Sequence, residues 1–272
     1  MRFPGTKLYR KLRYRKGFGI HSPFVYNLIT KVIEEKSQYY AFREIENFHS
    51  ELLKKKDFIA EITAKETQSS NYGAFLFRMI NFFKCDTVIQ VGCSTGVMSL
   101  YLVMASPVKS KYFLLEERTN LLNSVRNFLS ARSLKGISFL EGDYPENIKS
   151  FQVSEKKADL IFINSIPEGI ETDKFYSLIK PLISKTTILI IDNITKDKQK
   201  RNLWLKVQET DEVRITINLY SAGILFFNDK YPKKNYKAYL NNGKKQSIYK
   251  NRRYRTYISR WRKKSIKNKH AH

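Results

Sequence analysis

The sequence predicts an α/β fold: a doubly wound, mostly parallel seven-stranded sheet that is preceded by N-terminal helices and ends in a C-terminal antiparallel β-hairpin. Strand-like and helix-like segments alternate through the middle of the chain, which is typical of a doubly wound fold. The segments ADLIFIN and TTILIIDN are continuous apolar runs, as expected for parallel strands covered on both faces. In VRITINLYSAGILFFN two strand-like runs are joined only by SAG, which indicates the hairpin.

The individual elements follow from local pattern. Within residues 21–68 the apolar residues recur at helical spacing, and Ser22 before Pro23 is suited to begin the first helix. Ser70 or Asn71 is expected to cap the helix that follows this layer. The strands are predicted at residues 86–91, 111–116, 137–140, 158–164, 186–191, 212–219 and 222–228.

This pattern divides the chain into three parts. Residues 1–68 form a basic segment and a helical layer, and residues 69–229 form the doubly wound core. Residues 230–272 are a basic, aromatic tail with few aliphatic residues, for which a partly disordered extension is one interpretation.

Composition restricts the class of protein. The chain has 272 residues, 42% of them hydrophobic, which suffices for a sizeable core. It has no long apolar run of the kind that spans a membrane and no apolar signal segment at its start, so we expect a cytoplasmic protein without a transmembrane segment. Cys85 and Cys93 flank a predicted strand, too far apart for a relaxed disulfide, and are expected to be reduced.

The formal charge of +25 is concentrated at the two ends. Residues 1–20 hold 7 Lys or Arg and residues 230–272 hold 16, with no acid in either segment. These leave 27 of the 50 basic residues for the rest of the chain, against its 25 acids. The body is therefore nearly neutral, and its function has to be argued apart from the basic ends.

The tail interleaves aromatic and basic side chains. Tyr249, Tyr254, Tyr257 and Trp261 lie among five arginines between 252 and 262. Guanidinium groups neutralise phosphates while aromatic rings stack on bases or rest at a lipid interface, so RNA and an anionic membrane surface are both candidate partners. A solubilising extension is the third interpretation, and RNA binding would weaken steeply with salt.

The turn after the first predicted strand, in TVIQVGCSTGVMSLYL, carries glycines at both ends. Gly92 permits a sharp turn at the strand end, and Gly96 lets a helix or a ligand come close at the helix start. The spacing G-x-x-x-G differs from G-x-G-x-x-G, which disfavours a dinucleotide site. Glycines that merely aid packing are the alternative interpretation.

Acids follow the next two strands. The second strand ends in Glu116 and Glu117, where a carboxylate is suited to accept hydrogen bonds from both hydroxyls of a ribose. Asp143 follows the third strand and is suited to take the exocyclic amine of an adenine. Taken singly, each acid is better explained as a solvated loop residue or a helix cap. Because the ends of parallel strands share one edge, the three features together favour a ligand site there.

The segments GIHSPF, VGCSTG, LLEE, EGDY and IIDN, together with the terminal hairpin, give the sequence a family resemblance. It resembles class I S-adenosylmethionine-dependent methyltransferases, and more closely the bacterial group similar to small-molecule O-methyltransferases. The resemblance runs from KGFGIHSPFVYNLIT through INLYSAGILFFN and leaves the basic tail outside. It implies a Rossmann-like core, S-adenosylmethionine as cofactor, and methyl transfer to an acceptor, expected to be a hydroxyl of a small or surface-bound molecule.

The resemblance also implies roles for individual residues. The turn from Gly92 to Gly96, with Cys93 and Ser94 between them, would wrap the methionine moiety, with Gln90 beside it. Glu116 would hold the ribose and Asp143 would lie near the adenine.

The chain departs from the family pattern at three acid positions, where it has the amides Gln90, Asn164 and Asn218. An amide at 90 loses the charge assistance that roughly doubles the strength of a hydrogen bond to an ammonium. Asp192 and Asn193 match one half of the metal site of related O-methyltransferases, and Asn164 stands in the other half. Mg²⁺ prefers carboxylates, so it would bind here more weakly than to two acids.

Asp192, Asn193 and Asn164 are thus the candidate catalytic residues, and the candidate metal ligands if a metal is used. A strand-end turn is the alternative role for Asp192 and Asn193. Two functions from different classes remain: an active methyltransferase, or a catalytically degenerate scaffold that binds RNA or an anionic surface through its tail. A nucleobase amino-methyltransferase is disfavoured because NSIPEG lacks the Pro-Pro that such enzymes carry after the fourth strand.

Overall fold

The computed structural model describes residues 9, 11, 13–14, 16–55, 57–105, 110–118, 120–132, 134–154 and 157–241. The tail residues on which the RNA and membrane hypotheses depend, Tyr249 to Trp261 and their arginines, lie outside the described residues.

The described strands form one sheet in the order β3-β2-β1-β4-β5-β7-β6-β8. The strands are β1 (Thr87–Val91), β2 (Lys111–Glu116), β3 (Ile137–Glu141), β4 (Leu160–Ile163), β5 (Ile188–Asp192), β6 (Ile215–Asn218), β7 (Ala222–Phe226) and β8 (Lys234–Lys237). Strands β1 to β5 are parallel, and β7 runs antiparallel to both β5 and β6. The expected α/β class, parallel sheet and terminal hairpin are confirmed.

The sheet differs from the expectation in having an eighth strand. β8 pairs in parallel with β6, from Ile215 opposite Lys234 to Asn218 opposite Lys237. It lies within the segment 230–272 that the sequence assigned to the tail. Its sequence, KNYK, has no apolar alternation, so the strand forms because the outer edge of β6 offers it backbone hydrogen-bond partners.

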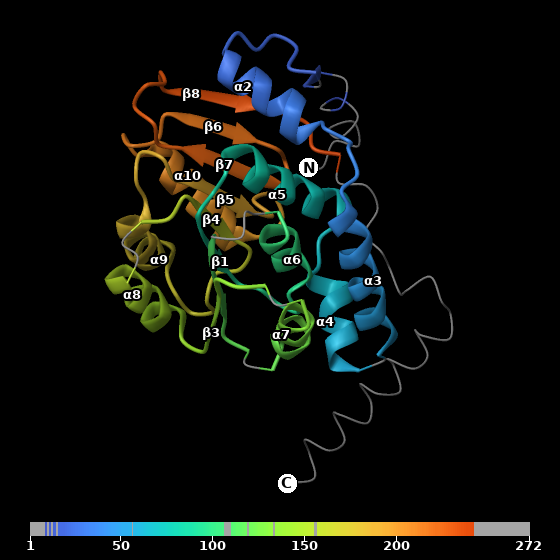
Figure 1. Cartoon of the computed structure of the whole chain (residues 1–272). Coiled ribbons are helices and arrows are strands. Elements are labelled where there is room, and N and C mark those ends of the chain that lie inside the picture. Colours follow the sequence, from blue (N-terminus) through green and yellow to red (C-terminus); the bar gives the residue numbers. More distant parts are fainter. Residues whose placement is uncertain are drawn as a thin grey trace.

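Helices cover both faces of the sheet (Figure 1). They are α2 (Pro23–Leu28), η1 (Ile29–Ile33), α3 (Tyr40–Lys54), α4 (Phe58–Glu66), α5 (Ser70–Phe83), α6 (Val97–Val103), α7 (Asn123–Ser130), α8 (Tyr144–Ser154), α9 (Thr172–Ile179), η2 (Lys180–Leu182) and α10 (Lys198–Glu209). One apolar cluster joins the sheet to α2, η1, α3, α5, α6 and α7, and a second joins its other face to α8, α9 and α10. The continuous apolar strands are buried between these two layers.

Side-chain caps fix where two of these helices begin. Ser22 caps α2 by accepting a hydrogen bond from the backbone N of Val25, as expected. The cap of α5 is Ser69, which accepts from the backbone N of Tyr72, so the prediction of Ser70 or Asn71 is wrong. Ser70 and Asn71 lie instead in the first turn of α5.

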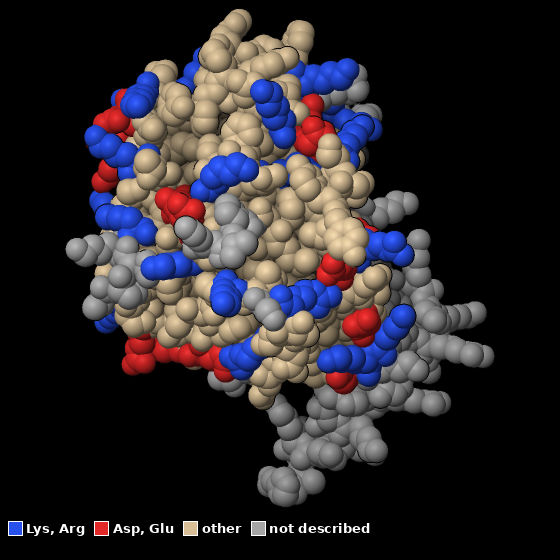
Figure 2. Space-filling model, viewed as in Figure 1, with Lys and Arg blue, Asp and Glu red and all other residues tan. Residues whose placement is uncertain are grey.

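Both cysteines are free and buried. Burial raises the pKa of Cys85 to about 12 and raises that of Cys93 well above its ordinary value, so both remain thiols at neutral pH. No helix within the described residues has the length and apolar content needed to cross a membrane. Figure 2 shows basic and acidic side chains interspersed on the viewed face, in keeping with the nearly neutral body.

Helices α5 and α6 approach closely at Gly73. A Cβ atom built on Gly73 would overlap the ring of Tyr101, which is itself 2% exposed. The ring is held by the surrounding core and cannot move aside without displacing its neighbours. The absence of a side chain at residue 73 therefore sets the distance between the two helices.

We expect Gly73→Ala to lower the free energy of unfolding by about 1–3 kcal/mol, because overpacking against Tyr101 outweighs the better helix propensity of alanine. Urea unfolding followed by circular dichroism would measure this change. Arg43→Ala, at an exposed position in the first turn of α3, is the control and should change stability by no more than about 0.5 kcal/mol. A Gly73→Ala protein as stable as the wild type would contradict the close approach.

Candidate active site at the carboxyl edge of the sheet

The sheet reverses its strand order between β1 and β4, which are neighbours in the sheet. The chain leaves β1 toward α6, on one face, whereas the segment after β4 leads to α9 on the other face. In open α/β sheets ligands bind outside the carboxyl ends of the strands at such a switch point. The residues that follow β1, β2, β3, β4 and β5 therefore define the candidate site.

The turn after β1 has a left-handed backbone at Gly92 (φ 82°), Ser94 (φ 53°) and Gly96 (φ 81°). A Cβ atom on Gly92 would overlap Ser165, which follows β4, and one on Gly96 would overlap Val125 of α7. The chain itself thus occupies the space that the two glycines leave open. Close packing accounts for both glycines, and the turn is held against the sheet by a 2.9 Å hydrogen bond from Gly92 N to Leu115 O.

Glu116 lies against this turn at the end of β2. Its Oε2 accepts a 2.5 Å hydrogen bond from the backbone N of Ser94, and the residue is 1% exposed. Its Oε1 accepts a 2.7 Å hydrogen bond from Nε of Arg118. Arg118 also contacts Glu66 at the end of α4 through Nη1 and Nη2, each at 2.9 Å. Arg118 therefore bridges the helical layer and the end of β2, and we call Glu66, Arg118 and Glu116 the arginine bridge.

Within the arginine bridge, Glu66 and Arg118 shift each other's pKa. Burial raises the pKa of Glu66, but the hydrogen bonds and positive charge of Arg118 outweigh it, so the pKa lies below its ordinary value of 4.5. Burial alone would lower the pKa of Arg118, yet contact with Glu66 and Glu116 raises it above its ordinary value. Glu66 and Arg118 are therefore both charged at neutral pH.

Glu117 and Asp143 lie at the same edge. Burial first, and then the negative charges of Glu116 and Asp143, raise the pKa of Glu117. The effect of Asp143 on Glu117 places the acids after β2 and β3 near one another. Asp143 also accepts a 2.9 Å hydrogen bond from Glu146 N at the start of α8, so it serves as a helix cap too.

Two amides converge on the carbonyl oxygen of Gly92. Gln90 donates from Nε2 at 3.3 Å and Asn164 donates from Nδ2 at 2.9 Å. A carboxylate at either position would have no hydrogen to donate and would repel the carbonyl oxygen. Gln90 is fully buried, and its Oε1 has no hydrogen-bond partner within the part of the chain that is described. The amide at residue 90 therefore supports the glycine turn and leaves one buried acceptor without a partner.

Asp192 ends β5 and is 2% exposed. Its Oδ2 accepts a 2.8 Å hydrogen bond from Nε2 of Gln68, which precedes α5. Burial and the neighbouring charge of Asp192 raise the pKa of Tyr72, so this phenol stays protonated beside the carboxylate. Asn193 has a left-handed backbone (φ 57°), and its carbonyl accepts from the backbone N atoms of Lys196 and Asp197. Asn193 thus forms the strand-end turn.

The candidate metal ligands do not assemble a donor set for Mg²⁺. The amide nitrogen of Asn164 faces Gly92, and the ammonium of Lys200 donates at 2.7 Å to the backbone oxygen of Asn164. A second cation beside this lysine would be repelled. Across the described ranges, no three His, Cys, Asp or Glu side chains come together at a spacing suited to a metal. Asn218, the third amide, accepts from Tyr220 N within the hairpin.

Three residues of this site were not predicted. Arg118 stands two residues after Glu116, and its sequence position was the only available signal. Gln68 and Asp192 are 124 residues apart, and Lys200 lies 36 residues from Asn164. Neither contact leaves a local pattern in the sequence.

The strand order, with its antiparallel seventh strand, and the acids at the carboxyl edge define the Rossmann-like methyltransferase fold. Residues 83–249 match the family model described as Methyltransferase domain, which covers more than half of the chain. The chain belongs to this family, and the resemblance found in the sequence is confirmed. A search of curated proteins found no match.

Solved structures of methyltransferases share the fold at low sequence identity. The O-methyltransferase TomG from Streptomyces achromogenes, in complex with SAM, has a TM-score of 0.53 at 12% identity, covering 75% of this chain and 94% of its own. The SAH-bound methyltransferase PaMTH1 from Podospora anserina has a TM-score of 0.55 at 13% identity, covering 72% and 91%. The O-methyltransferase from Bacillus cereus, in complex with SAH, has a TM-score of 0.54 at 13% identity, covering 75% and 97%.

We expect Arg118→Gln to lower the free energy of unfolding at neutral pH by about 1–3 kcal/mol, because it leaves the buried Glu116 carboxylate without its cation. The estimate is below that for a fully buried pair because Arg118 is 41% exposed. Urea unfolding would measure the loss. Lys206→Gln, which breaks the exposed pair with Asp173, is the control and should cost less than about 1 kcal/mol. Equal effects of the two substitutions would contradict a special role for the bridge.

The contribution of Glu66 should depend on pH. Because its pKa in the folded protein is depressed below 4.5, its stabilising effect is fully present above that pH and is lost as pH falls through the lower value. The stability difference between the wild type and Glu66→Gln should therefore be constant near neutrality and shrink on acidification. Unfolding measured over a pH series checks this, and a difference that grows in acid would be inconsistent with the bridge.

Proposed function

We propose that the protein is an S-adenosylmethionine-dependent methyltransferase that transfers a methyl group to a hydroxyl of a small-molecule acceptor. The family model supports methyl transfer. Two of the structures described above are named O-methyltransferases, which supports a hydroxyl as the acceptor. Because these structures are only 12% and 13% identical to this chain, they support a shared fold but not shared site residues. The roles of the site residues are therefore argued from the contacts within this chain.

The observation that carries the proposal is the set of acceptors at the carboxyl edge. The cofactor has an ammonium, a ribose diol and an adenine amine, all of which donate hydrogen bonds. The unpartnered Oε1 of the buried Gln90 is suited to the ammonium, Glu116 to the ribose and Asp143 to the amine. The turn that contains Cys93 and Ser94 lies between them and would enclose the methionine moiety. Gln90, Glu116 and Asp143 thus offer acceptors that fit the donors of S-adenosylmethionine.

Cofactor binding would compete with the arginine bridge. Both oxygens of Glu116 already accept hydrogen bonds, from Ser94 and from Arg118. The ribose hydroxyls would take over contacts that Arg118 makes, and Glu66 would keep the displaced guanidinium at the edge of the site. Arg118 would keep its charged partner Glu66, whereas Glu116 would exchange a cation for neutral hydroxyl donors, so the exchange subtracts from the free energy gained on cofactor binding.

The chain's own residues then act by positioning and proton transfer. S-adenosylmethionine, when bound, supplies an electrophilic methyl group. Asp192, held by Gln68, is the carboxylate suited to accept the proton that the acceptor hydroxyl releases as its oxygen forms the new bond to carbon. Asn164 and Asn193 shape the edge beside it, and no metal is assigned to them.

Isothermal titration with S-adenosylmethionine tests the proposal. The wild type should bind, and Glu116→Gln should weaken binding at least about tenfold, since a hydrogen bond to a charged group contributes about 1.5–3 kcal/mol. Glu66→Gln is the matched control: it breaks the same bridge but keeps Glu116, and should change the affinity less than about threefold. Thermal melting confirms that each variant is folded.

Two results would overturn this assignment. No detectable heat with millimolar S-adenosylmethionine would remove the cofactor. Equal loss of affinity in Glu116→Gln and Glu66→Gln would show that Glu116 acts only through the bridge.

A further inference from the structure

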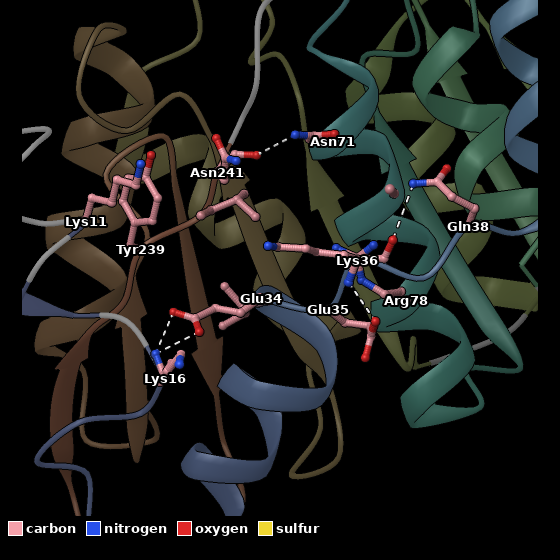
Figure 3. Close-up of a pocket in the computed structure, with 13 residues that line it drawn as sticks. Lys11, Lys16, Glu34, Glu35, Lys36, Gln38, Asn71, Arg78, Tyr239 and Asn241 are labelled. Atoms are coloured by element: carbon pink, nitrogen blue, oxygen red, sulfur yellow. Dashed lines mark hydrogen bonds between the residues drawn. The ribbon is translucent and has the colours of Figure 1, made fainter.

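A pocket of about 510 Å³ lies between the end of η1, the first half of α5 and the chain that follows β8. We call it the α5 pocket, lined on one wall by Asn71, Ala74 and Arg78 of α5 (Figure 3). Its volume is within the range of sites for small organic ligands. The methyltransferase chemistry described above uses none of its lining residues.

In the described part of the chain, four cations line the α5 pocket: Lys11, Lys16, Lys36 and Arg78. Arg78 is 6% exposed and donates from Nε to the backbone oxygen of Val32 at 2.7 Å. Among the described residues no acceptor contacts its two terminal nitrogens. Likewise, within the described chain, no carboxylate pairs with the ammonium groups of the three lysines. Figure 3 shows the side chain of Lys36 extending into the space between α5 and the segment 239–241.

Two acids among the described residues also line the pocket, and both accept hydrogen bonds from backbone N atoms. Glu34 accepts from the backbone N of Lys16 at 2.8 and 2.7 Å. Glu35 accepts at 2.6 Å from the backbone N of Lys36, and it also accepts from the backbone and the hydroxyl of Ser37. The hydrogen bond from the Ser37 hydroxyl lowers the pKa of Glu35, so it remains ionised. Among the described lining residues, four cations against two carboxylates give a net charge of +2.

A buried arginine with unused donors is costly unless an anion satisfies it. The planar guanidinium offers two parallel N–H groups to an oxyanion, and lysines add point charges. A carboxylate would neutralise half of the pocket's charge, whereas a phosphate monoester is close to a dianion at neutral pH and would neutralise nearly all of it. The apolar side chains of Ile33, Ala74 and Leu240 leave room for an organic body.

We propose that the α5 pocket binds a small phosphate monoester, with Arg78 and Lys36 as the principal contacts of its phosphate. The ligand is then suited to be the methyl acceptor, a step that rests on the proposed function. Gln68, which holds Asp192, and Asn71 on the pocket rim are three residues apart at the start of α5. Arg78 lies two turns further on, about 10 Å along the helix. A ligand anchored at Arg78 would approach the edge that carries Asp192 by extending along α5 toward Asn71.

The experiment uses the full chain and phenyl phosphate as the probe, with benzoate as the carboxylate of matched size. Titration calorimetry should show tighter binding of phenyl phosphate than of benzoate. Lys36→Gln should weaken phenyl phosphate about threefold to tenfold and Arg78→Gln at least tenfold. Lys31→Gln is the matched control, since Lys31 is exposed on η1, outside the pocket lining, and it should change the affinity less than twofold.

The results of these titrations test phosphate binding in the α5 pocket independently of the proposed methyltransferase function. Phenyl phosphate binding that is the same in Lys36→Gln, Lys31→Gln and the wild type would place the anion elsewhere, for instance on the basic tail, and would overturn the pocket. Benzoate binding as tightly as phenyl phosphate would overturn the phosphate assignment. Because Arg78 is buried, the exposed Lys36 provides the test if Arg78→Gln fails to fold. S-adenosylmethionine titrated into the same samples reports on the proposed function alone, and its failure would leave the phosphate result standing.

Discussion

A single guanidinium group, that of Arg118, joins the N-terminal helices to the edge of the sheet where the candidate site lies. It pairs with Glu66 at the end of α4 and with the buried Glu116 at the end of β2. Glu116 in turn holds the backbone of the glycine turn through Ser94. The helical layer, the second strand and the turn after the first strand therefore depend on one another, and a cofactor that engages Glu116 would be sensed by α4.

The amides at residues 90 and 164 have the same structural role. Both donate to the carbonyl oxygen of Gly92, which two carboxylates could not do. The two amides provide hydrogen bonds that support the turn and bring no negative charge to it. The ammonium of Lys200 donates to the backbone oxygen of Asn164 and adds a positive charge beside this amide. Under the proposed function, methyl transfer at such a site would rely on the carboxylate of Asp192 and on positioning.

The positive charge of the protein is found both at the ends of the chain and around the α5 pocket. Most of it belongs to the ends of the chain, and the body itself is nearly neutral. The α5 pocket, however, brings charge from one end and from the body together: Lys11 and Lys16 come from the basic N-terminal end, and Lys36 and Arg78 come from the body. An even surface balance therefore coexists with a local excess of charge, and this local excess is what a specific anion would recognise.

The sequence by itself determined the strands, their doubly wound order, the terminal hairpin and the placement of Glu116, Asp143 and Asp192 at strand ends. These features depend on local periodicity and on the rule that parallel strands end at one edge. Tertiary structure alone decided the strand β8, the arginine bridge, the contact of Gln68 with Asp192 and the α5 pocket. The physical reason is that each of these joins segments far apart in the chain, so it exists only after helices have packed on the sheet, and no residue pattern within one segment records it.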